Sequence, residues 1–415
     1  MIKKTVLLFT FVSFYLTAFG QVSDESFVNL SHSIDSILQK EVDDNRIPGA
    51  VVMIKLGKQA VYLKAYGYAQ KLDYNQAILE QPEKMTTGHL FDIASLTKVV
   101  GTTTAIMLLA DQGLLQIDDP VGKYLGTFKS TDKKEITVRH LLNHTSGLYE
   151  WYPMYYRAKN KEEVYKLIAD LPLKYKVGSQ RAYSDLGFTI LGQIIETVSG
   201  MPLETYLEQH IFLPLGMKNT VYNPLKKDRF KNIAATSHGN PYEKRMVHDP
   251  SLGFTFKEID PSQWSGWRNY TLKGEVNDGN AWYANDGISG AAGLFSTAED
   301  LQKLVDMITN KGALGDKQFI SEKTLKEFLT PDAFKNGLGW MMDPENSFIK
   351  NGPAGTFGHT GFTGTSIAVI PEQHISVILL TNRQNMGLLP EGTYYNVNAL
   401  RQKIFRTALL NHHHQ

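Results

Sequence analysis

The chain has 415 residues, of which 42% are apolar and 20% charged, so it carries enough apolar side chains to build a buried core. Its 43 basic and 42 acidic residues nearly cancel, which excludes the basic surface typical of nucleic-acid binding and a polybasic membrane patch. Cysteine is absent, so disulfides, thiolate metal sites and a cysteine nucleophile are excluded, and a covalent nucleophile would be Ser, Thr, Lys or a carboxylate.

The first twenty residues predict a cleaved signal peptide. Lys3-Lys4 precedes an apolar stretch from Val6 to Leu16, and Ala18-Phe19-Gly20 has the small residues that signal peptidase requires. The apolar stretch is shorter than the ~20 residues of a spanning helix. We therefore expect a periplasmic or secreted protein that begins at Gln21 and has no membrane span after cleavage.

The next elements are a helix, a hairpin and a buried helix. Apolar residues between Phe27 and Leu38 recur on one helical face, and the breaker Ile47-Pro48-Gly49 follows. Strands are expected at 50–56 and 59–68, followed by a polar stretch over residues 71–87. A long apolar helix then begins at Ser95 and ends at Gly113. Further helices are expected at 136–143, 161–171 and 185–198.

The second half of the chain ends in strands again. Residues 223–289 are rich in Gly, Pro, Asn and aromatics, and we interpret them as one wall of a cleft. The sequence Ser296-Thr297-Ala298-Glu299 predicts a capped helix to Ile308. Alternating apolar residues at 366–370 and 375–380 predict a second hairpin.

This order predicts an α+β fold with one antiparallel sheet built from both chain ends, flanked by helices, and a mostly helical domain inserted between them. The expected sheet domain comprises residues 21–94 and 290–411, and the helical domain residues 95–289. Ser95 lies where the chain passes from the first domain into the second, and ligand sites are common at such junctions.

A Ser-x-x-Lys pattern is the strongest chemical signal, and it occurs three times. Ser130–Lys133 and Ser347–Lys350 lie in polar segments, where a lysine is expected to be hydrated and a poor base. Ser95 alone opens a buried helix, so Lys98 lies on the same face and burial favours its neutral, basic form. The alternative at this point is a helix-capping serine with a lysine that extends along apolar surface.

Two histidines four residues apart, His140 and His144, have the spacing of a shared metal site on a helix. No acidic partner accompanies them, so we expect a structural role and no metal. No cofactor-binding signature is present either.

The chain resembles the penicillin-recognising serine hydrolases, a group that includes class C β-lactamases, D-alanyl-D-alanine carboxypeptidases, D-aminopeptidases and related esterases. The resemblance covers about residues 47–381. Its motifs are Phe91–Lys98, Gly113–Leu125, Ile136–Leu148, Pro214-Leu215-Gly216-Met217, Gly293–Thr297, Gly337-Leu338-Gly339-Trp340 and Gly358-His359-Thr360-Gly361.

The resemblance implies roles for further residues. Tyr183-Ser184-Asp185 stands where the family has Tyr-x-Asn, which makes Tyr183 the expected acid–base partner of Ser95 and Lys98 and places Asp185 at the substrate. An ionised Asp185 near Lys98 would favour the ammonium form and repel anionic substrates.

His359-Thr360-Gly361 resembles the family's third motif and implies substrate binding by these three residues. By the same analogy, the backbone N–H groups of Ser95 and Phe362 form the oxyanion hole.

These features together predict an exported serine hydrolase that acts through an acyl-enzyme. The activity that we expect first is that of a D-alanyl-D-alanine carboxypeptidase-like peptidase acting on cell-wall peptides. The alternatives are a carboxylesterase or D-amino-acid amidase, a class C-like β-lactamase, and a non-catalytic binding protein on the same scaffold. We expect a small peptide or ester substrate and no cofactor; the sequence leaves the oligomeric state open.

Overall fold

The structure, a computed structural model, describes residues 24–57, 60–129 and 131–412. The predicted signal peptide, residues 1–20, lies outside the described residues.

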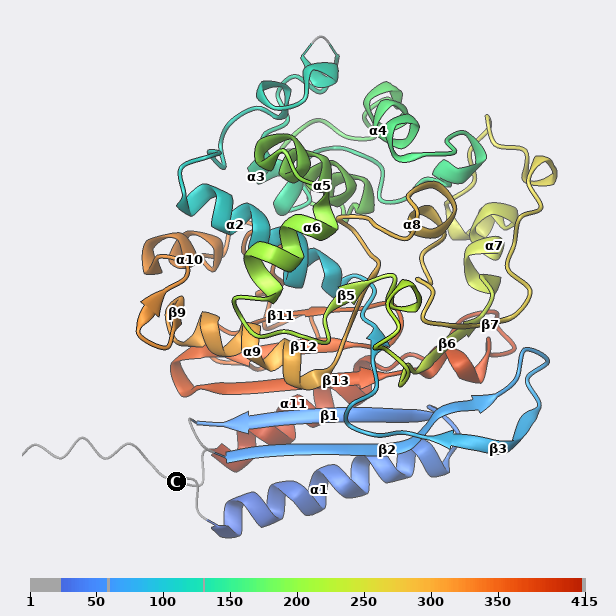
Figure 1. Ribbon diagram of the computed structural model, residues 1–415, viewed down its shortest axis with the longest axis vertical. Coiled ribbons are helices and arrows are strands. Elements are labelled where there is room, and N and C mark those ends of the chain that lie inside the picture. The colour runs from blue at the N-terminus through green and yellow to red at the C-terminus, as the bar shows by residue number, and fades with distance from the viewer. Residues whose placement is uncertain (1–23, 58–59, 130, 413–415) are drawn as a thin grey trace, which may run out of the picture.

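A six-stranded antiparallel sheet contains strands from both ends of the chain (Figure 1), in the order β11-β12-β13-β1-β2-β3. In chain order these strands are β1 (Gly49–Leu56), β2 (Ala60–Leu72), β3 (Ile78–Lys84), β11 (Phe357–Thr360), β12 (Ser366–Ile370) and β13 (Ile375–Thr381). Strand β1 pairs with β13, Ala50 lying opposite Thr381, so the two ends of the chain meet in the middle of the sheet. Both predicted hairpins, β1–β2 and β12–β13, are confirmed.

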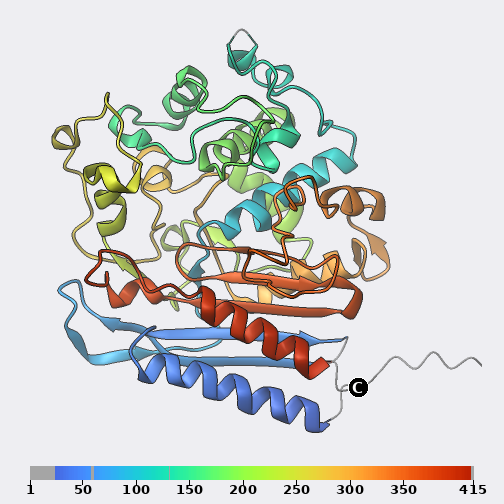
Figure 2. The same cartoon turned by 180° about the vertical axis from the view of Figure 1, so that it is seen from behind.

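Each face of the sheet buries its own set of side chains, because successive residues of a strand point to opposite faces. Val52 and Ile54 of β1 pack with α1 (Asp24–Asp43) and α11 (Asn398–His412). Val51 and Met53 belong instead to the larger core that the helical region shares. Figures 1 and 2 show α1 and α11 on one side of the sheet and the remaining helices on the other.

The helical region lies between the two groups of strands in the sequence and above the sheet in Figure 1. Its helices and those that return to the sheet are α2 (Thr104–Asp111), α3 (Val138–Leu142), α4 (Lys161–Asp170), α5 (Asp185–Ser199), α6 (Leu203–Leu207), α7 (Pro241–His248), α8 (Gly279–Ala284), α9 (Ala298–Thr309) and α10 (Glu322–Phe328). The helices expected at 136–143, 161–171 and 185–198 are α3, α4 and α5. The α+β architecture expected from the sequence is therefore confirmed.

Small sheets join the helical region to the main sheet. They comprise the three-stranded β4-β8-β5, the pair β6-β7 and the pair β9-β10, with β4 (Phe91–Asp92), β5 (Val221–Tyr222), β6 (Ala235–His238), β7 (Thr271–Lys273), β8 (Leu294–Ser296), β9 (Ala313–Leu314) and β10 (Lys317–Gln318). Strand β4 leads to Ser95 and pairs with β8, which follows Ala291, a residue whose carbonyl accepts a hydrogen bond from Lys98.

Several secondary-structure elements differ from the sequence-based expectation. The polar stretch 71–87 contains β3, an edge strand, and residues 223–289 contain the short elements β6, β7, α7 and α8. The N-cap residue of α9 is Thr297, one residue later than the predicted Ser296. Its side chain accepts a hydrogen bond from the backbone N–H of Asp300.

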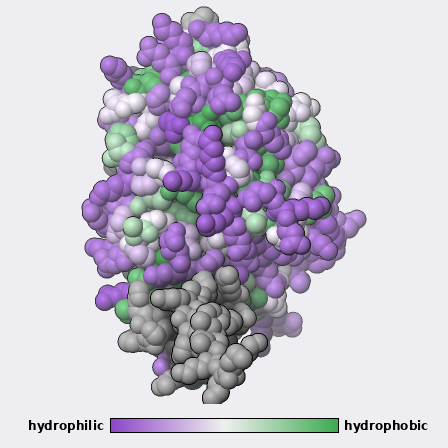
Figure 3. Space-filling model, turned by 90° about the vertical axis from the view of Figure 1, so that its left-hand side faces the viewer, coloured by the Kyte–Doolittle hydropathy of each residue, from purple (hydrophilic) through white to green (hydrophobic). Residues whose placement is uncertain are grey.

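Within the described residues no single helix is long and apolar enough to cross a membrane. Helix α5 and the helical segment 203–212, bent by 74° relative to each other, meet the length and composition criteria only as a pair. On the face in Figure 3, hydrophilic residues predominate and hydrophobic ones form small separate groups.

Candidate active site

Ser95 lies in a tight turn between β4 and the buried helix. Ala94, just before it, has a φ of 46°, in the left-handed region that non-glycine residues seldom adopt. Asp92 holds this turn: its carboxylate accepts hydrogen bonds from the backbone N–H of Ala94 at 2.9 Å and of Asn277 at 2.6 Å. Backbone strain of this kind is common at functional sites, where neighbouring structure sustains it.

The helix that Ser95 opens contains a π-helical segment, Lys98–Thr103, close to its start and continues as α2. Short π segments within helices often occur at functional sites. Gly101 in this segment lets the helix pack closely, because a Cβ there would lie 2.8 Å from a methyl group of Leu207. The predicted buried helix is confirmed, and its π-helical first part was not expected.

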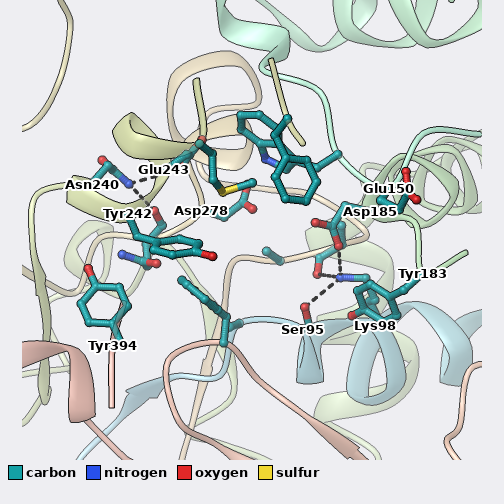
Figure 4. A pocket seen from close by; sticks show the side chains of 18 residues that line it. Ser95, Lys98, Glu150, Tyr183, Asp185, Asn240, Tyr242, Glu243, Asp278 and Tyr394 are labelled. Carbon is teal, nitrogen blue, oxygen red and sulfur yellow. Dashed lines mark hydrogen bonds and ion pairs between the residues drawn. The ribbon is translucent and has the colours of Figure 1, made fainter. Parts of the chain in front are cut away.

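Lys98 is completely buried, and its ammonium is held by three oxygen atoms. Its Nζ donates to Ser95 Oγ at 3.0 Å and to the carbonyl of Ala291 at 2.8 Å, and lies 2.7 Å from Asp185 Oδ1. Figure 4 shows these three contacts converging on Nζ. The expected Ser95–Lys98 pair is thus brought together, and Asp185 turns toward it.

The charge state of Lys98 follows from this environment. Burial acts to lower its pKa, but the nearby Asp185 carboxylate and Tyr183 act in the opposite direction and leave the pKa above its ordinary value. Lys98 is therefore an ammonium at neutral pH in the free protein, and it must lose a proton before it can act as a base. An ionised Asp185 near Lys98 is expected from the sequence to favour the ammonium form of the lysine, and the structure places Asp185 where it has this effect.

Tyr183 completes the group around Ser95. The Lys98 Nζ atom lies 5.2 Å from the centre of its ring, and both Ser95 and Tyr183 line the same cavity. Burial raises the pKa of Tyr183, an effect opposed by the charge of Lys98 and by interaction with Ser95. The phenol is accordingly protonated at neutral pH.

Two buried histidines flank the Tyr183 ring. The His144 ring centre lies 4.4 Å from that of Tyr183, and the His359 ring centre lies 6.0 Å away. Burial, together with the charge of Lys98, lowers the pKa of His359 to about 3 and that of His144 well below its usual value. Both imidazoles are therefore neutral.

His359 differs from the role that the resemblance implies. Its side chain is 1% exposed, and its Nδ1 donates to the carbonyl of Thr360 at 2.9 Å instead of facing the cavity. Thr360 and Gly361 do line the cleft. A neutral, buried imidazole does not attract a substrate carboxylate, so the geometry supports His359 as a packing partner of Tyr183.

The segment after β11 is fixed against the turn that carries Ser95. Thr363 donates to the carbonyl of Asp92 at 2.7 Å, and Thr365 donates to that of Ile93 at 3.1 Å. A Cβ on Gly361 would come within 2.4 Å of the same Ile93 carbonyl, so only glycine allows this approach. Phe362, which follows, lines the cavity together with Ser95, and its role in the oxyanion hole stays a prediction.

The other Ser-x-x-Lys patterns lie elsewhere. Lys133 is buried, contrary to the hydrated state expected for it, and its Nζ lies 2.8 Å from Asp132 Oδ1. Ser347 donates to the carbonyl of Asp343 at 2.5 Å, and Lys350 is exposed. Ser130 lies outside the described residues.

The histidine pair has local structural roles. The Nδ1 atom of His140 accepts from the backbone N–H of Thr137 at 3.1 Å, and that of His144 accepts from the backbone N–H of Ser184 at 3.0 Å. Across the described parts of the chain, the search for three or more His, Cys, Asp or Glu side chains able to hold a metal ion finds no such group.

A cavity of about 300 Å³ opens beside Ser95. It is lined by apolar and aromatic side chains and by carboxylates that the sequence did not single out, among them Glu150, Glu243 and Asp278. The region 223–289 supplies many of these residues, so the prediction that it forms a wall of a cleft is confirmed. The local sequence offers one hint of Asp278, since an aspartate directly before the first residue of a helix is a common N-cap.

Comparison with known proteins identifies the family of this chain. The family model described as Beta-lactamase matches residues 34–401. A protein of Bacillus subtilis (strain 168) named "N-acetylmuramyl-L-alanine amidase" is 32% identical over 384 residues, which cover 88% of this chain and 83% of the relative. A Salmonella typhimurium protein named "Putative D-alanyl-D-alanine carboxypeptidase" is 32% identical over 399 residues, 88% of each chain.

The same fold occurs in solved structures. The octameric penicillin-binding protein homologue from Pyrococcus abyssi superimposes with a TM-score of 0.65 at 24% identity, covering 91% of this chain and 77% of the other. The family model and both relatives cover most of the sequence. The chain therefore belongs to the beta-lactamase family of penicillin-recognising serine hydrolases and is a serine hydrolase enzyme.

Proposed function

We propose that this protein is an exported peptidase that removes the terminal residue from D-alanyl-D-alanine peptides of the cell wall through an acyl-enzyme at Ser95. The observation that carries the proposal is the contact between Ser95 Oγ and the buried Lys98 in a cavity that Tyr183 also lines. The names of the two relatives, "Putative D-alanyl-D-alanine carboxypeptidase" and "N-acetylmuramyl-L-alanine amidase", support this substrate class.

The proposed reaction has two steps. Once Lys98 has released its proton to solvent, its amine takes the Ser95 proton as Oγ attacks the carbonyl carbon of the penultimate residue. Tyr183 then donates its proton to the leaving amine and recovers one from Lys98, the C–N bond breaks, and terminal D-alanine departs. Water then attacks the Ser95 ester, the serine recovers its proton, and the shortened peptide is released. Backbone N–H groups of Ser95 and Phe362 stabilise the oxyanion in both steps.

A second cavity, of about 560 Å³, supports cleavage at a free carboxyl terminus. It shares Ser95 and Tyr183 with the first cavity, and its lining includes Arg383 and Arg401. Burial lowers the pKa of Arg383 to about 10 and that of Arg401 to about 9, so both remain charged at neutral pH. A terminal carboxylate on the leaving residue would meet positive potential on this side of Ser95.

The test is intact-protein mass spectrometry combined with product analysis. A fluorophosphonate should add once to the protein, and Ser95→Ala should abolish that addition, whereas Ser347→Ala, a serine of an unrelated Ser-x-x-Lys pattern, should not. With Nα-acetyl-L-Lys-D-Ala-D-Ala the product should be free D-alanine, at a rate that falls by roughly 10⁶ in Ser95→Ala.

Other products would point to other activities. Release of the intact peptide from a muramyl peptide, with no D-alanine formed, would favour the amidase activity named for the Bacillus relative. Turnover of p-nitrophenyl acetate alone would favour an esterase. Labelling that survives in Ser95→Ala would refute the assignment of the nucleophile.

A further inference from the structure

Arg401, in the first turn of α11, holds both ends of the loop that follows β11. Its Nη2 donates to the carbonyl of Gly361 at 3.0 Å and to the carbonyl of Thr365 at 2.9 Å. Its Nη1 donates to Asn398 Oδ1 at 2.7 Å, a contact that helps to fix the plane of the guanidinium. Arg401 is only 7% exposed, so these protein oxygens take the place of water around it. The rigid fork of donors on an arginine suits such a bridge between two carbonyls.

Arg401 is a buried cation whose hydrogen-bond partners are uncharged. The oxygens that it contacts belong to two carbonyls and one amide, and its guanidinium forms no ion pair within the described residues. Burial and the like charge of Arg383 lower its pKa to about 9, so it remains charged at neutral pH. Burying a cation without a carboxylate costs free energy, and a neutral amide could hold a carbonyl at lower cost. The charge therefore points to a role beyond packing.

The carbonyl of Gly361 and the N–H of Phe362 belong to the same peptide unit. The unit is trans and planar, so the two groups point in opposite directions. A donor at the carbonyl oxygen therefore fixes the direction of the N–H. Positive charge at that oxygen also polarises the peptide and strengthens the N–H as a donor. The backbone N–H of Gly364 donates to the same oxygen at 3.0 Å, but it carries no charge.

The second carbonyl that Arg401 holds connects the loop with the nucleophile turn. It belongs to Thr365, whose hydroxyl donates to the carbonyl of Ile93 at 3.1 Å. Arg401 thus ties the segment that carries Phe362 to the turn that carries Ser95. These two residues supply the N–H groups of the predicted oxyanion hole, whose effect depends on the position of both donors.

We propose that Arg401 is a positioning residue for the oxyanion hole, which acts through the carbonyl of Gly361 to orient and strengthen the N–H of Phe362. This inference rests on the proposed function, because that function takes this N–H as an oxyanion donor. Every acyl substrate forms an oxyanion at Ser95, so the effect extends to substrates that have no carboxylate.

Two other roles of Arg401 make different predictions. A purely structural arginine would lower the melting temperature when replaced and leave the rate per folded molecule unchanged. An arginine that acts only by attracting the terminal carboxylate of a peptide would affect peptides and leave neutral esters unchanged. A positioning residue affects esters and peptides alike, because both pass through the same oxyanion.

The experiment uses two probes that have no carboxylate. The first is kcat/KM for p-nitrophenyl acetate, and the second is the inhibition constant of phenylboronic acid, whose tetrahedral adduct with Ser95 presents an oxygen to the oxyanion hole. In Arg401→Gln both should worsen about tenfold, which is less than the 10²–10³ that loss of a whole oxyanion donor costs, because the N–H itself remains. Melting temperatures are measured on the same preparations.

Three further variants test the assignment to this contact. Asn398→Ala keeps the guanidinium but removes its support, so both probes should worsen by a smaller factor; it decides the matter if Arg401→Gln does not fold. Arg401→Lys keeps the charge and should recover part of the loss, and a lysine no better than glutamine would overturn the role of the charge. Arg139→Gln is the control, because Arg139 pairs with Asp118 and lines neither cavity at Ser95.

The outcomes separate this inference from the proposed function. Unchanged ester rates and unchanged boronate inhibition in folded Arg401→Gln and Asn398→Ala would overturn the positioning role and leave the acyl-enzyme proposal standing. A loss confined to Nα-acetyl-L-Lys-D-Ala-D-Ala would also overturn it, in favour of carboxylate attraction. If no ester or peptide acylates Ser95 in the wild type, the proposed function itself is refuted.

Discussion

Removal of the Asp185 charge is the most informative perturbation of this site. Asp185 Oδ1 lies 2.7 Å from the Nζ of a completely buried Lys98, and this pairing holds the pKa of Lys98 above its ordinary value. An opposite charge this close shifts a pKa by roughly 1–3 units, so Asp185→Asn should lower the pKa of Lys98 by about 2 units. The neutral fraction of Lys98 at pH 7 then rises about 100-fold.

The expected gain in rate is smaller than the gain in neutral lysine. A base of lower pKa accepts a proton less readily, which cancels roughly half of the logarithmic gain, so kcat/KM for a neutral ester at pH 7 should rise about tenfold. The apparent pKa of the rising limb belongs to the coupled group and should move to lower pH. Acylation by an anionic β-lactam should rise further than that by the ester, because a negative charge has left the cavity.

The assay is kcat/KM against pH with p-nitrophenyl acetate and with a penicillin. Glu150→Gln is the matched control, since it neutralises another carboxylate of the same cavity, one that pairs with Lys174 instead of Lys98. If Asp185→Asn leaves both the profile and the substrate ratio as in the wild type, Lys98 is not the titrating base and this reasoning is wrong.

Three further predictions concern the site and the core. Lys98→Arg keeps the charge but cannot release a proton, so activity should fall by at least 10³ with an unchanged melting temperature; normal turnover would make Lys98 a spectator. His359→Gln should leave the limbs of the pH profile between 5 and 8 in place, because burial already keeps this imidazole neutral, and loss of a limb near 6.5 would show that it titrates. Leu38→Ala, at a fully buried position between α1 and the sheet, should cost about 2–5 kcal/mol in urea unfolding, whereas Val28→Ala, half exposed on the same helix, should cost far less.

Much of the fold was predictable because its core elements are strongly patterned. Strands β1 and β13 alternate between two cores, and the apolar face of α1 covers one of them, so their periodicity is visible in the sequence. Strand β3 was missed for the opposite reason. It is an edge strand with Pro82 in its middle and mostly exposed residues, so no buried face imposes an alternating pattern.

The π-helical segment that carries Lys98 also had no sequence signal. Apolar spacing distinguishes a helix from a strand, but a local change in helical winding is set by packing, here by the close approach of Gly101 to Leu207. Burial of His359 depends similarly on tertiary structure. The motif predicts that His359 lies on a strand next to the cleft. Whether its side chain faces the cleft or the interior depends on how β11 pairs and packs in the complete sheet.

The orientation of the Asp185 side chain could not be predicted from the local sequence, because it depends on contacts with a distant segment of the chain. Ser184 caps α5 by accepting from the backbone N–H of Gly187 at 3.2 Å, and the N–H of Asp185 donates to the carbonyl of Glu150 at 2.9 Å. These contacts fix the first turn of α5 against a segment some 35 residues away, and they direct the Asp185 carboxylate to Lys98. Asp185, which the sequence shows only as a departure from Tyr-x-Asn, thus favours the charged form of Lys98, the base in the proposed mechanism.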